Sequence, residues 1–204
     1  SRAANLACKH STTVALLTWE CNMKLHDNIR SADSRTRLPG SYTAPAQPAA
    51  EDQVADFIAA IINLTKPLRV LELGTAFGHT SFKIGQALKR NGVGILDTMD
   101  INETRLVEAR KRCFDLPVQI HKCSYRDFKV PDHVRYDLAF FDSDRANRDV
   151  EYATFKPFLN DGATLLFHDA GEQHKEAVQA LSRLNLPLVY LPCPRGLMIA
   201  SHKA

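Results

Sequence analysis

From residue 68 onward, short runs of apolar residues alternate with segments whose apolar residues recur at helical spacing. The apolar runs cover residues 68–73, 94–99, 117–121, 136–141, 163–167, 186–191 and 197–200. The helix candidates between the first six runs cover residues 79–90, 103–114, 125–129, 147–159 and 172–184. Because strands that alternate with helices of this length form βαβ units, the pattern predicts an α/β fold with a mainly parallel sheet.

The two ends of this pattern depart from simple alternation. Before the first run, Val54, Ile58 and Ile62 recur at helical spacing and Pro67 follows, which predicts an additional helix. At the other end, only residues 192–196 separate the last two apolar runs. A parallel crossover needs about a dozen residues or more, so the seventh strand is expected to run antiparallel to the sixth. The whole pattern predicts a doubly wound, seven-stranded sheet.

Residues 1–50 follow a different pattern and are interpreted as an N-terminal appendage. Residues 12–29 could form a helix with an apolar side. Residues 38–48 contain three prolines and one glycine, which is typical of an extended linker. We expect the appendage to form a small helical cap that covers the substrate pocket or pairs two subunits in a homodimer.

Composition narrows the class of protein. The chain has 204 residues, 45% of them hydrophobic, and a net charge of only +3, which argues against a nucleic-acid partner. Its five cysteines form no C-x-x-C pair, which argues against disulfides and a zinc site. The absence of a membrane-length apolar run and of a framed signal peptide predicts a cytoplasmic protein without a membrane partner. Three histidines are expected at the surface or in loops: His79, His121 and His174.

A glycine-containing turn follows the first predicted strand. In this turn, Gly74 and Gly78 permit a tight bend and let a ligand approach the backbone closely. Thr80 and Ser81 fall where the next helix begins, and the N–H groups at a helix start can bind a carboxylate. Since ligands of open parallel sheets bind beyond the carboxyl ends of the strands, the turn predicts a ligand site.

The end of the second predicted strand helps to identify the ligand. Asp100 can accept hydrogen bonds from both hydroxyls of a ribose, and Ile101 beside it can pack on an adenine. A dinucleotide fingerprint requires G-x-G-x-x-G, whereas this chain has G-x-x-x-G with Glu72 two residues ahead. The missing middle glycine leaves less room for a pyrophosphate, and an acid suits a cationic ligand. The pattern favours S-adenosylmethionine, with an NAD-dependent oxidoreductase as the alternative.

The pattern E-x-G-x-x-x-G-x-[ST], the strand-end acid and the antiparallel last strand resemble class I S-adenosylmethionine-dependent methyltransferases. The resemblance covers residues 51–202 and implies a methyltransferase domain over residues 51–204. It implies that Glu72 and the backbone of the turn hold the methionine end of the cofactor. The expected cofactor-binding residues are Glu72, Gly74, Thr75, Ala76, Gly78, Thr80, Ser81, Asp100, Ile101, Ser124 and Asp142.

Three polar residues end the fourth and fifth predicted strands, at the edge that carries the glycine turn: Asp142, His168 and Asp169. This arrangement resembles small-molecule O-methyltransferases of the catechol and caffeoyl-CoA type, in which two acids and an Asn bind a divalent cation. The resemblance implies Asp142 and Asp169 as metal ligands and Mg²⁺ as the ion. Here Ala170 stands at the position of the Asn, so one ligand is missing.

Two basic residues offer other chemistry. Arg145 replaces the Lys of that family, and because arginine stays protonated it could hold an anionic substrate but not act as a base. His168 could remove the proton of a hydroxyl without a metal, as in a related branch acting on sugars and natural products. Asp142, His168 and Asp169 are the predicted catalytic residues. The predicted activity is methyl transfer to a small-molecule hydroxyl; an RNA methyltransferase and a non-catalytic cofactor-binding protein are further alternatives.

A chain shortened to begin near Gln47 should keep its affinity for S-adenosylhomocysteine and lose methyl transfer. The removed residues precede the first element of the predicted core and belong to the predicted substrate cap. Calorimetric titration and a turnover assay on one preparation check this prediction. Loss of both properties would mean that the appendage forms part of the cofactor pocket.

Overall fold

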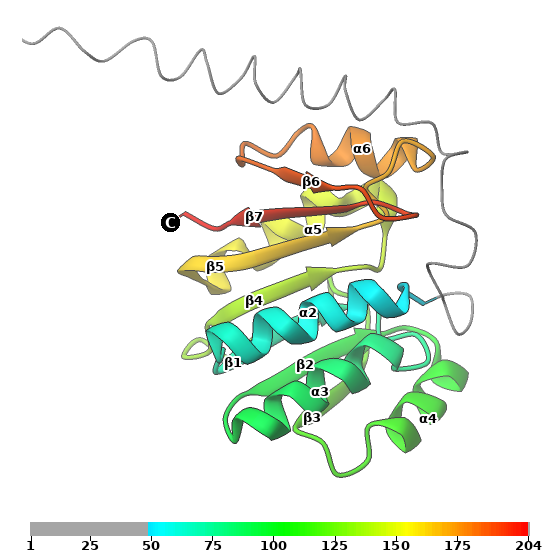
Figure 1. The fold of residues 1–204 in the computed structure, drawn as a ribbon, viewed down its shortest axis with the longest axis vertical. Helices are drawn as coiled ribbons and strands as arrows, with labels where there is room; N and C mark the ends of the chain where they lie inside the picture. The colour runs from blue at the N-terminus through cyan, green and yellow to red at the C-terminus, as the bar shows by residue number, and fades with distance from the viewer. Residues whose placement is uncertain (1–48, 204) are drawn as a thin grey trace, which may run out of the picture. The chain divides into compact units, whose positions relative to one another are not determined.

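The computed structural model describes residues 49–203, and these form one α/β domain around a seven-stranded sheet (Figure 1). The strands are β1 (Arg69–Leu73), β2 (Ile95–Asp100), β3 (Val118–Lys122), β4 (Tyr136–Phe141), β5 (Leu159–His168), β6 (Val189–Leu191) and β7 (Leu197–Ser201). The α-helices of this part are α2 (Asp52–Thr65), α3 (His79–Asn91), α4 (Glu103–Arg112), α5 (Arg148–Phe155) and α6 (Lys175–Leu181). The seven strands and the helix ahead of the first one confirm the predicted fold class.

The strand order places a ligand crevice at one edge of the sheet. The order is β3-β2-β1-β4-β5-β7-β6, and strands β1 to β5 pair in parallel. Strand β7 lies between β5 and β6 and is antiparallel to both, which confirms the prediction from the short final connection. Strand β1 lies between β2 and β4, so the chain reverses its direction across the sheet there. Ligands of doubly wound folds bind at such a switch point.

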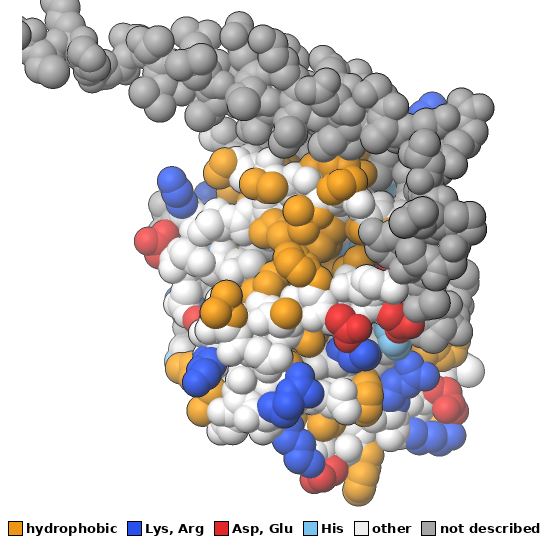
Figure 2. Space-filling view, in the orientation of Figure 1, with side chains coloured by type: hydrophobic (Ala, Val, Ile, Leu, Met, Phe, Trp, Pro, Cys, Tyr) orange, Lys and Arg blue, Asp and Glu red, His pale blue; other side chains and the backbone are white. Residues whose placement is uncertain are grey.

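Alternate residues of the buried strands face two hydrophobic cores, one on each side of the sheet. Val70 of β1 packs with α2 and α3, which lie over one face, whereas Leu71 belongs to the core under α5 and α6 (Figure 1). On the first face, hydrophobic side chains gather beside α2, where no described helix covers β6 and β7 (Figure 2). The two cores fix the carboxyl ends of the strands and thereby the position of the ligand site.

Some predicted elements differ from the structure. Residues 125–129 form a turn and not a helix, because so short a segment between a strand and Pro131 cannot sustain one. The predicted helix at 147–159 ends at Phe155, where a 3₁₀ turn, Lys156–Phe158, contains Pro157. The helix predicted at 172–184 is confined to α6. The predicted appendage helix and linker lie outside the described residues.

Two other expectations concern the cellular environment. In the described part of the chain, no helix is long and apolar enough to cross a membrane. The cysteines of that part, Cys113, Cys123 and Cys193, are free thiols.

Replacing Gly74 with Ala should destabilise the fold far more than replacing Gly92 with Ala. Both glycines have positive φ, 101° and 70°, so both substitutions carry a left-handed strain of about 1–2 kcal/mol. A Cβ on Gly74 would lie 2.5 Å from the Asp142 carbonyl oxygen, whereas nothing lies within 4 Å at Gly92. This clash should add about 1–3 kcal/mol, measurable by urea unfolding. Equal losses at the two positions would contradict the close contact.

Candidate active site

A cavity of about 710 Å³ opens at the carboxyl ends of β1, β2, β4 and β5. Its lining includes eight of the predicted cofactor residues: Gly74, Thr75, Ala76, Thr80, Asp100, Ile101, Ser124 and Asp142. It also includes four residues near the predicted chemical site: Ser143, Arg145, Asp169 and Arg195. The structure therefore brings the predicted cofactor turn and the predicted acids to one cavity.

The glycine turn is pinned to the end of β2. The Asp100 carboxylate accepts a hydrogen bond from the Ala76 N–H at 2.9 Å and one from the Asn102 N–H at 2.8 Å. The Gly74 and Thr75 N–H groups both donate to the Met99 carbonyl. Each carboxylate oxygen has two acceptor sites, so both Asp100 oxygens keep one for a ligand. A ribose presents two hydroxyl donors, which this pair of acceptor sites matches.

Three predicted cofactor residues lie behind the turn and not in the cavity lining. Glu72 is fully buried, and one of its oxygens accepts hydrogen bonds from the Ser81 hydroxyl and, at 2.6 Å, from the Thr98 hydroxyl. Burial raises the pKa of Glu72 to about 8, so the carboxyl is neutral near pH 7. Gly78 packs against Ala109 of α4. These residues support the turn, and the predicted attraction of the Glu72 charge for a cationic ligand finds no support here.

His168 is fully buried between two carboxylates. Its Nδ1 lies 2.9 Å from Asp142 Oδ1, and its Nε2 lies 2.8 Å from Glu51 Oε2. Burial lowers the pKa of this imidazole, but the nearby Asp142 charge and both hydrogen bonds raise it to about 9. The imidazolium therefore donates to both acids and has no lone pair for a substrate proton. This geometry contradicts the predicted role of His168 as a base and makes it the positive partner of Asp142.

The other acid is paired with an arginine that the sequence analysis did not single out. Arg195, in the turn between β6 and β7, places Nε 2.6 Å from Asp169 Oδ1 and donates from Nη2 to Oδ2 at 2.8 Å. Its Nη1 donates to the Ala49 carbonyl at 2.7 Å, and its backbone N–H donates to Glu51. Asp169 has a φ of 58°, a left-handed conformation that is rare outside glycine. The rigid turn at Arg195 thus holds an unusual backbone at the cavity wall.

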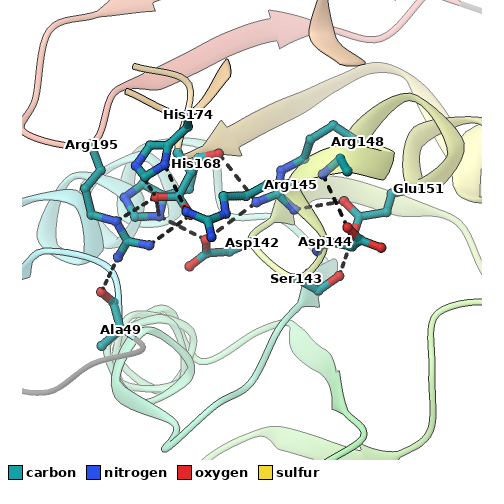
Figure 3. Close-up of polar contacts among 12 residues, drawn as sticks. Ala49, Asp142, Ser143, Asp144, Arg145, Arg148, Glu151, His168, His174 and Arg195 are labelled. Atoms are coloured by element: carbon teal, nitrogen blue, oxygen red, sulfur yellow. Dashed lines mark hydrogen bonds and ion pairs between the residues drawn. The ribbon is translucent and has the colours of Figure 1, made fainter. Parts of the chain in front are cut away.

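A second buried arginine lies beside Asp142. Arg148 is fully buried, donates to Glu151 at 2.9 Å, and lies 3.7 Å from Asp142 Oδ1 (Figure 3). Glu151 also accepts hydrogen bonds from the Ser143 hydroxyl and the Asp144 N–H, which shape the loop after β4. Arg148 and Glu151 are three positions apart on a predicted helix, a spacing that could have indicated an ion pair. The burial of this ion pair could not be predicted from the sequence.

His174, one of the histidines expected at the surface or in loops, contacts two residues that line the cavity, and His79 itself lines it. His174 Nδ1 accepts a hydrogen bond from Arg145 Nη1 at 2.9 Å (Figure 3). Its Nε2 lies 3.3 Å from Asp169 Oδ1. Burial lowers the pKa of His174, which keeps it neutral beside two arginines. The other two histidines are also partly buried: His79 pairs with Asp52 and His121 with Asp97. All three were expected at the surface or in loops: His174 does lie in the loop before α6, whereas His79 begins α3 and His121 lies in β3.

The resemblance to metal-dependent O-methyltransferases implies a divalent cation beside Asp142 and Asp169. Asp142, His168 and Asp169 offer ligand atoms that all lie within 4.8 Å of one another. His168, however, donates through both nitrogens, and Arg195 donates to Asp169 Oδ2 and forms an ion pair with Oδ1. Only Oδ2 of Asp142 is left without a partner among the described residues. Ala170 offers no side-chain oxygen as a third ligand. In this arrangement the residues do not fit a divalent cation, because protein cations already balance the acids.

The sequence matches one family of known proteins in its central part. Residues 71–170 match a family model described as a methyltransferase domain. This segment begins in β1, contains the glycine turn and Asp100, and ends just after Asp169. No curated protein matches the chain.

Three solved structures illustrate the fold similarity. TomG, an O-methyltransferase from Streptomyces achromogenes involved in tomaymycin synthesis and solved with SAM, is 14% identical, with a TM-score of 0.64 over 76% of this chain and 82% of that one. An O-methyltransferase from Bacillus cereus solved with SAH is 13% identical, with a TM-score of 0.63 over 91% of this chain and 90% of that one. The SAH-bound methyltransferase PaMTH1 from Podospora anserina is 12% identical, with a TM-score of 0.65 over 98% of this chain and 100% of that one. At these identities the similarity shows a shared fold.

Replacing Glu72 with Gln should remove a pH dependence of the free energy of unfolding. The unfolded chain loses this proton near pH 4.5, whereas the folded protein keeps it up to about pH 8. The stability of the wild type therefore falls across this interval, by at most about 1.4 kcal/mol per pH unit from this group. Urea unfolding without cofactor should show that the free energy of unfolding falls less steeply with pH in Glu72→Gln than in the wild type. Glu108→Gln, at an exposed position of α4, should leave this slope unchanged. Parallel curves for Glu72→Gln and wild type would contradict the neutral buried acid.

Proposed function

We propose that this chain, which belongs by its fold and its methyltransferase domain to the class I S-adenosylmethionine-dependent methyltransferases, methylates a hydroxyl oxygen of a small molecule. The observation that carries the proposal is the shared cavity, which joins the Asp100-pinned turn to the acids at the ends of β4 and β5. The O-methyltransferases from Streptomyces achromogenes and Bacillus cereus, which share the fold, support oxygen as the acceptor atom.

The contact between two strand ends brings the reacting groups together. Gly74 lies so close to the Asp142 backbone that a Cβ there would be 2.5 Å from its carbonyl oxygen. If the methionine end of the cofactor is held over the turn at Gly74, it therefore lies next to the strand end that carries Asp142. The cofactor supplies an electrophilic methyl group on a positively charged sulfur. Holding the acceptor oxygen in line with that methyl group can contribute about 7–11 kcal/mol to the acceleration.

Asp142 is the acceptor for the hydroxyl proton in this proposal. Its contacts with His168 and Arg148 use Oδ1, and the described residues leave Oδ2 without a partner. Asp142 lines the cavity, so Oδ2 can accept a hydrogen bond from the substrate hydroxyl. His168 and Arg148 fix the orientation of the carboxylate and are positioning residues.

The rival functions make different demands on the cavity. A dinucleotide would need room for a pyrophosphate at the turn, where Gly74 already touches the loop after β4. An RNA substrate would need a basic surface, whereas the cavity lining mixes acids and arginines. A non-catalytic binding protein would not need Asp142 and Asp169 at the cavity wall. The expected homodimer stays a prediction.

Asp100→Asn should weaken binding of S-adenosylhomocysteine by about 1.5–3 kcal/mol, because it removes charge-assisted hydrogen bonds to the ribose. Asp56→Asn is the matched control, since Asp56 is an exposed acid on α2 that pairs with Lys83 away from the cavity lining. Calorimetry should show tight binding of S-adenosylhomocysteine and no binding of NAD to the wild type. Tighter binding of NAD, or an unchanged affinity in Asp100→Asn, would refute the cofactor assignment.

Methyl transfer itself is tested with isotopically labelled S-adenosylmethionine and a panel of phenols, sugars and acyl conjugates. We expect an O-methylated product with at least one class, and a large loss of turnover in Asp142→Asn with cofactor binding retained. If RNA added to the same assay takes up the label and no small molecule does, the RNA methyltransferase is favoured. Cofactor binding with no transfer to any acceptor would favour the binding protein.

A further inference from the structure

We propose that the guanidinium of Arg195 occupies the place that a divalent cation holds in metal-dependent O-methyltransferases, and that it binds the acceptor oxygen directly. The inference rests on the proposed function, because it concerns the acceptor side of the same cavity. It assigns a substrate-binding role to a residue outside the predicted site. Its consequence is methyl transfer without a metal ion.

The geometry of the Asp169–Arg195 pair carries the proposal. The two carboxylate oxygens face two different guanidinium nitrogens, at 2.6 Å from Nε and 2.8 Å from Nη2. The Nη2 contact is a hydrogen bond and the Nε contact is an ion pair, and charge-assisted contacts of this kind are stronger than those between neutral groups. A metal ligated by Asp169 would first have to displace this guanidinium. Arg195 therefore competes with any cation for the same two oxygen atoms.

The guanidinium also keeps donors available for a ligand. Arginine has five N–H groups, of which one on Nη1 serves the Ala49 carbonyl and two others face Asp169. The described residues record no partner for the second hydrogen on Nη1 or on Nη2. Arg195 lines the cavity, so these two N–H groups can bind an oxygen on which negative charge develops. This is the electrostatic contribution that a metal ion makes in other enzymes.

The turn around Arg195 is built to hold it still. The Gly171 N–H donates to the Arg195 carbonyl at 2.8 Å, and the Ala170 N–H donates to the Gly196 carbonyl at 3.0 Å. Gly196 has a φ of 79°, and a Cβ there would lie 2.2 Å from the Gly171 nitrogen. The β6–β7 turn is thus locked against the loop that follows β5. A fixed donor needs no reorganisation when charge develops, which makes it effective.

The charges at the site balance without a metal. Arg195 compensates Asp169, while His168 and Arg148 flank Asp142. In the transfer step, the acceptor oxygen forms a bond to the methyl carbon as the carbon–sulfur bond breaks, and that electron pair stays on sulfur. The hydroxyl proton passes to Asp142 Oδ2. Arginine stays protonated throughout and acts only through its charge and its N–H groups.

The direct test is a calorimetric titration of the full chain with Mn²⁺ alone. We expect no specific site in the wild type, and turnover unchanged by exhaustive EDTA. Arg195→Met keeps the aliphatic stem and removes the guanidinium, which frees the carboxylate of Asp169. This variant should bind Mn²⁺ at least about tenfold more tightly than the wild type and keep its affinity for S-adenosylhomocysteine. Its turnover should fall about 100-fold or more and recover in part when Mn²⁺ is added.

Arg183→Met is the matched control. Arg183 also pairs with an acid through Nε and Nη2, here by two hydrogen bonds to Asp149, but on the exposed surface and away from the cavity lining. It should change neither Mn²⁺ affinity nor turnover. The comparison separates a special role of Arg195 from the general effect of unmasking a carboxylate.

Two results would overturn the proposal. The first is a single tight Mn²⁺ site in the wild type that Asp169→Asn abolishes, with turnover lost in EDTA. The second is an Arg195→Met variant that keeps its circular dichroism and cofactor binding but gains no Mn²⁺ affinity. The metal titrations need no acceptor, so they report on Arg195 even if the panel yields no methylated product. In that case the proposed function fails and the placement of the cation is still decided.

Discussion

The structure depends on charge compensation at the carboxyl edge of its sheet. Three acids meet there, Glu51, Asp142 and Asp169, and each would be costly to bury alone. His168 bridges the first two, and Arg195 pairs with the third and is tied to Glu51 through its backbone N–H. The network links the start of α2, the ends of β4 and β5, and the β6–β7 turn. Removing any cation would leave a largely buried negative charge without its partner.

This network separates the two sides of the cavity by their physical character. On the cofactor side, Asp100 pins a backbone turn whose glycine touches the neighbouring strand end, so recognition depends on close approach and hydrogen bonding. On the acceptor side, fixed positive groups surround carboxylates, so recognition depends on electrostatics. The neutral Glu72 beneath the turn belongs to neither side and acts through its hydrogen bonds to Ser81 and Thr98.

The fold could be predicted from the sequence because it follows from local patterns, whereas the roles of the site residues stay predictions. Alternating apolar runs gave the seven strands, and the short final connection gave the direction of β7. The cavity lies at the strand ends, where the sequence places Asp100 and Asp142. The partners of those residues could not be predicted, since Glu51 lies 117 positions from His168 and the pair has no spacing that a pattern could reveal. The direction of a pKa shift also depends on burial, which a sequence does not state.

A crystal structure of the protein grown with S-adenosylhomocysteine and Mn²⁺, with data collected at the manganese absorption edge, would show which cation lies beside Asp169. We expect the ribose hydroxyls on Asp100, the sulfur between Gly74 and Asp142, and Arg195 on Asp169 with no anomalous peak beside it. A manganese peak bridging Asp142 and Asp169, with Arg195 turned away, would show that a metal ion and not Arg195 occupies this place.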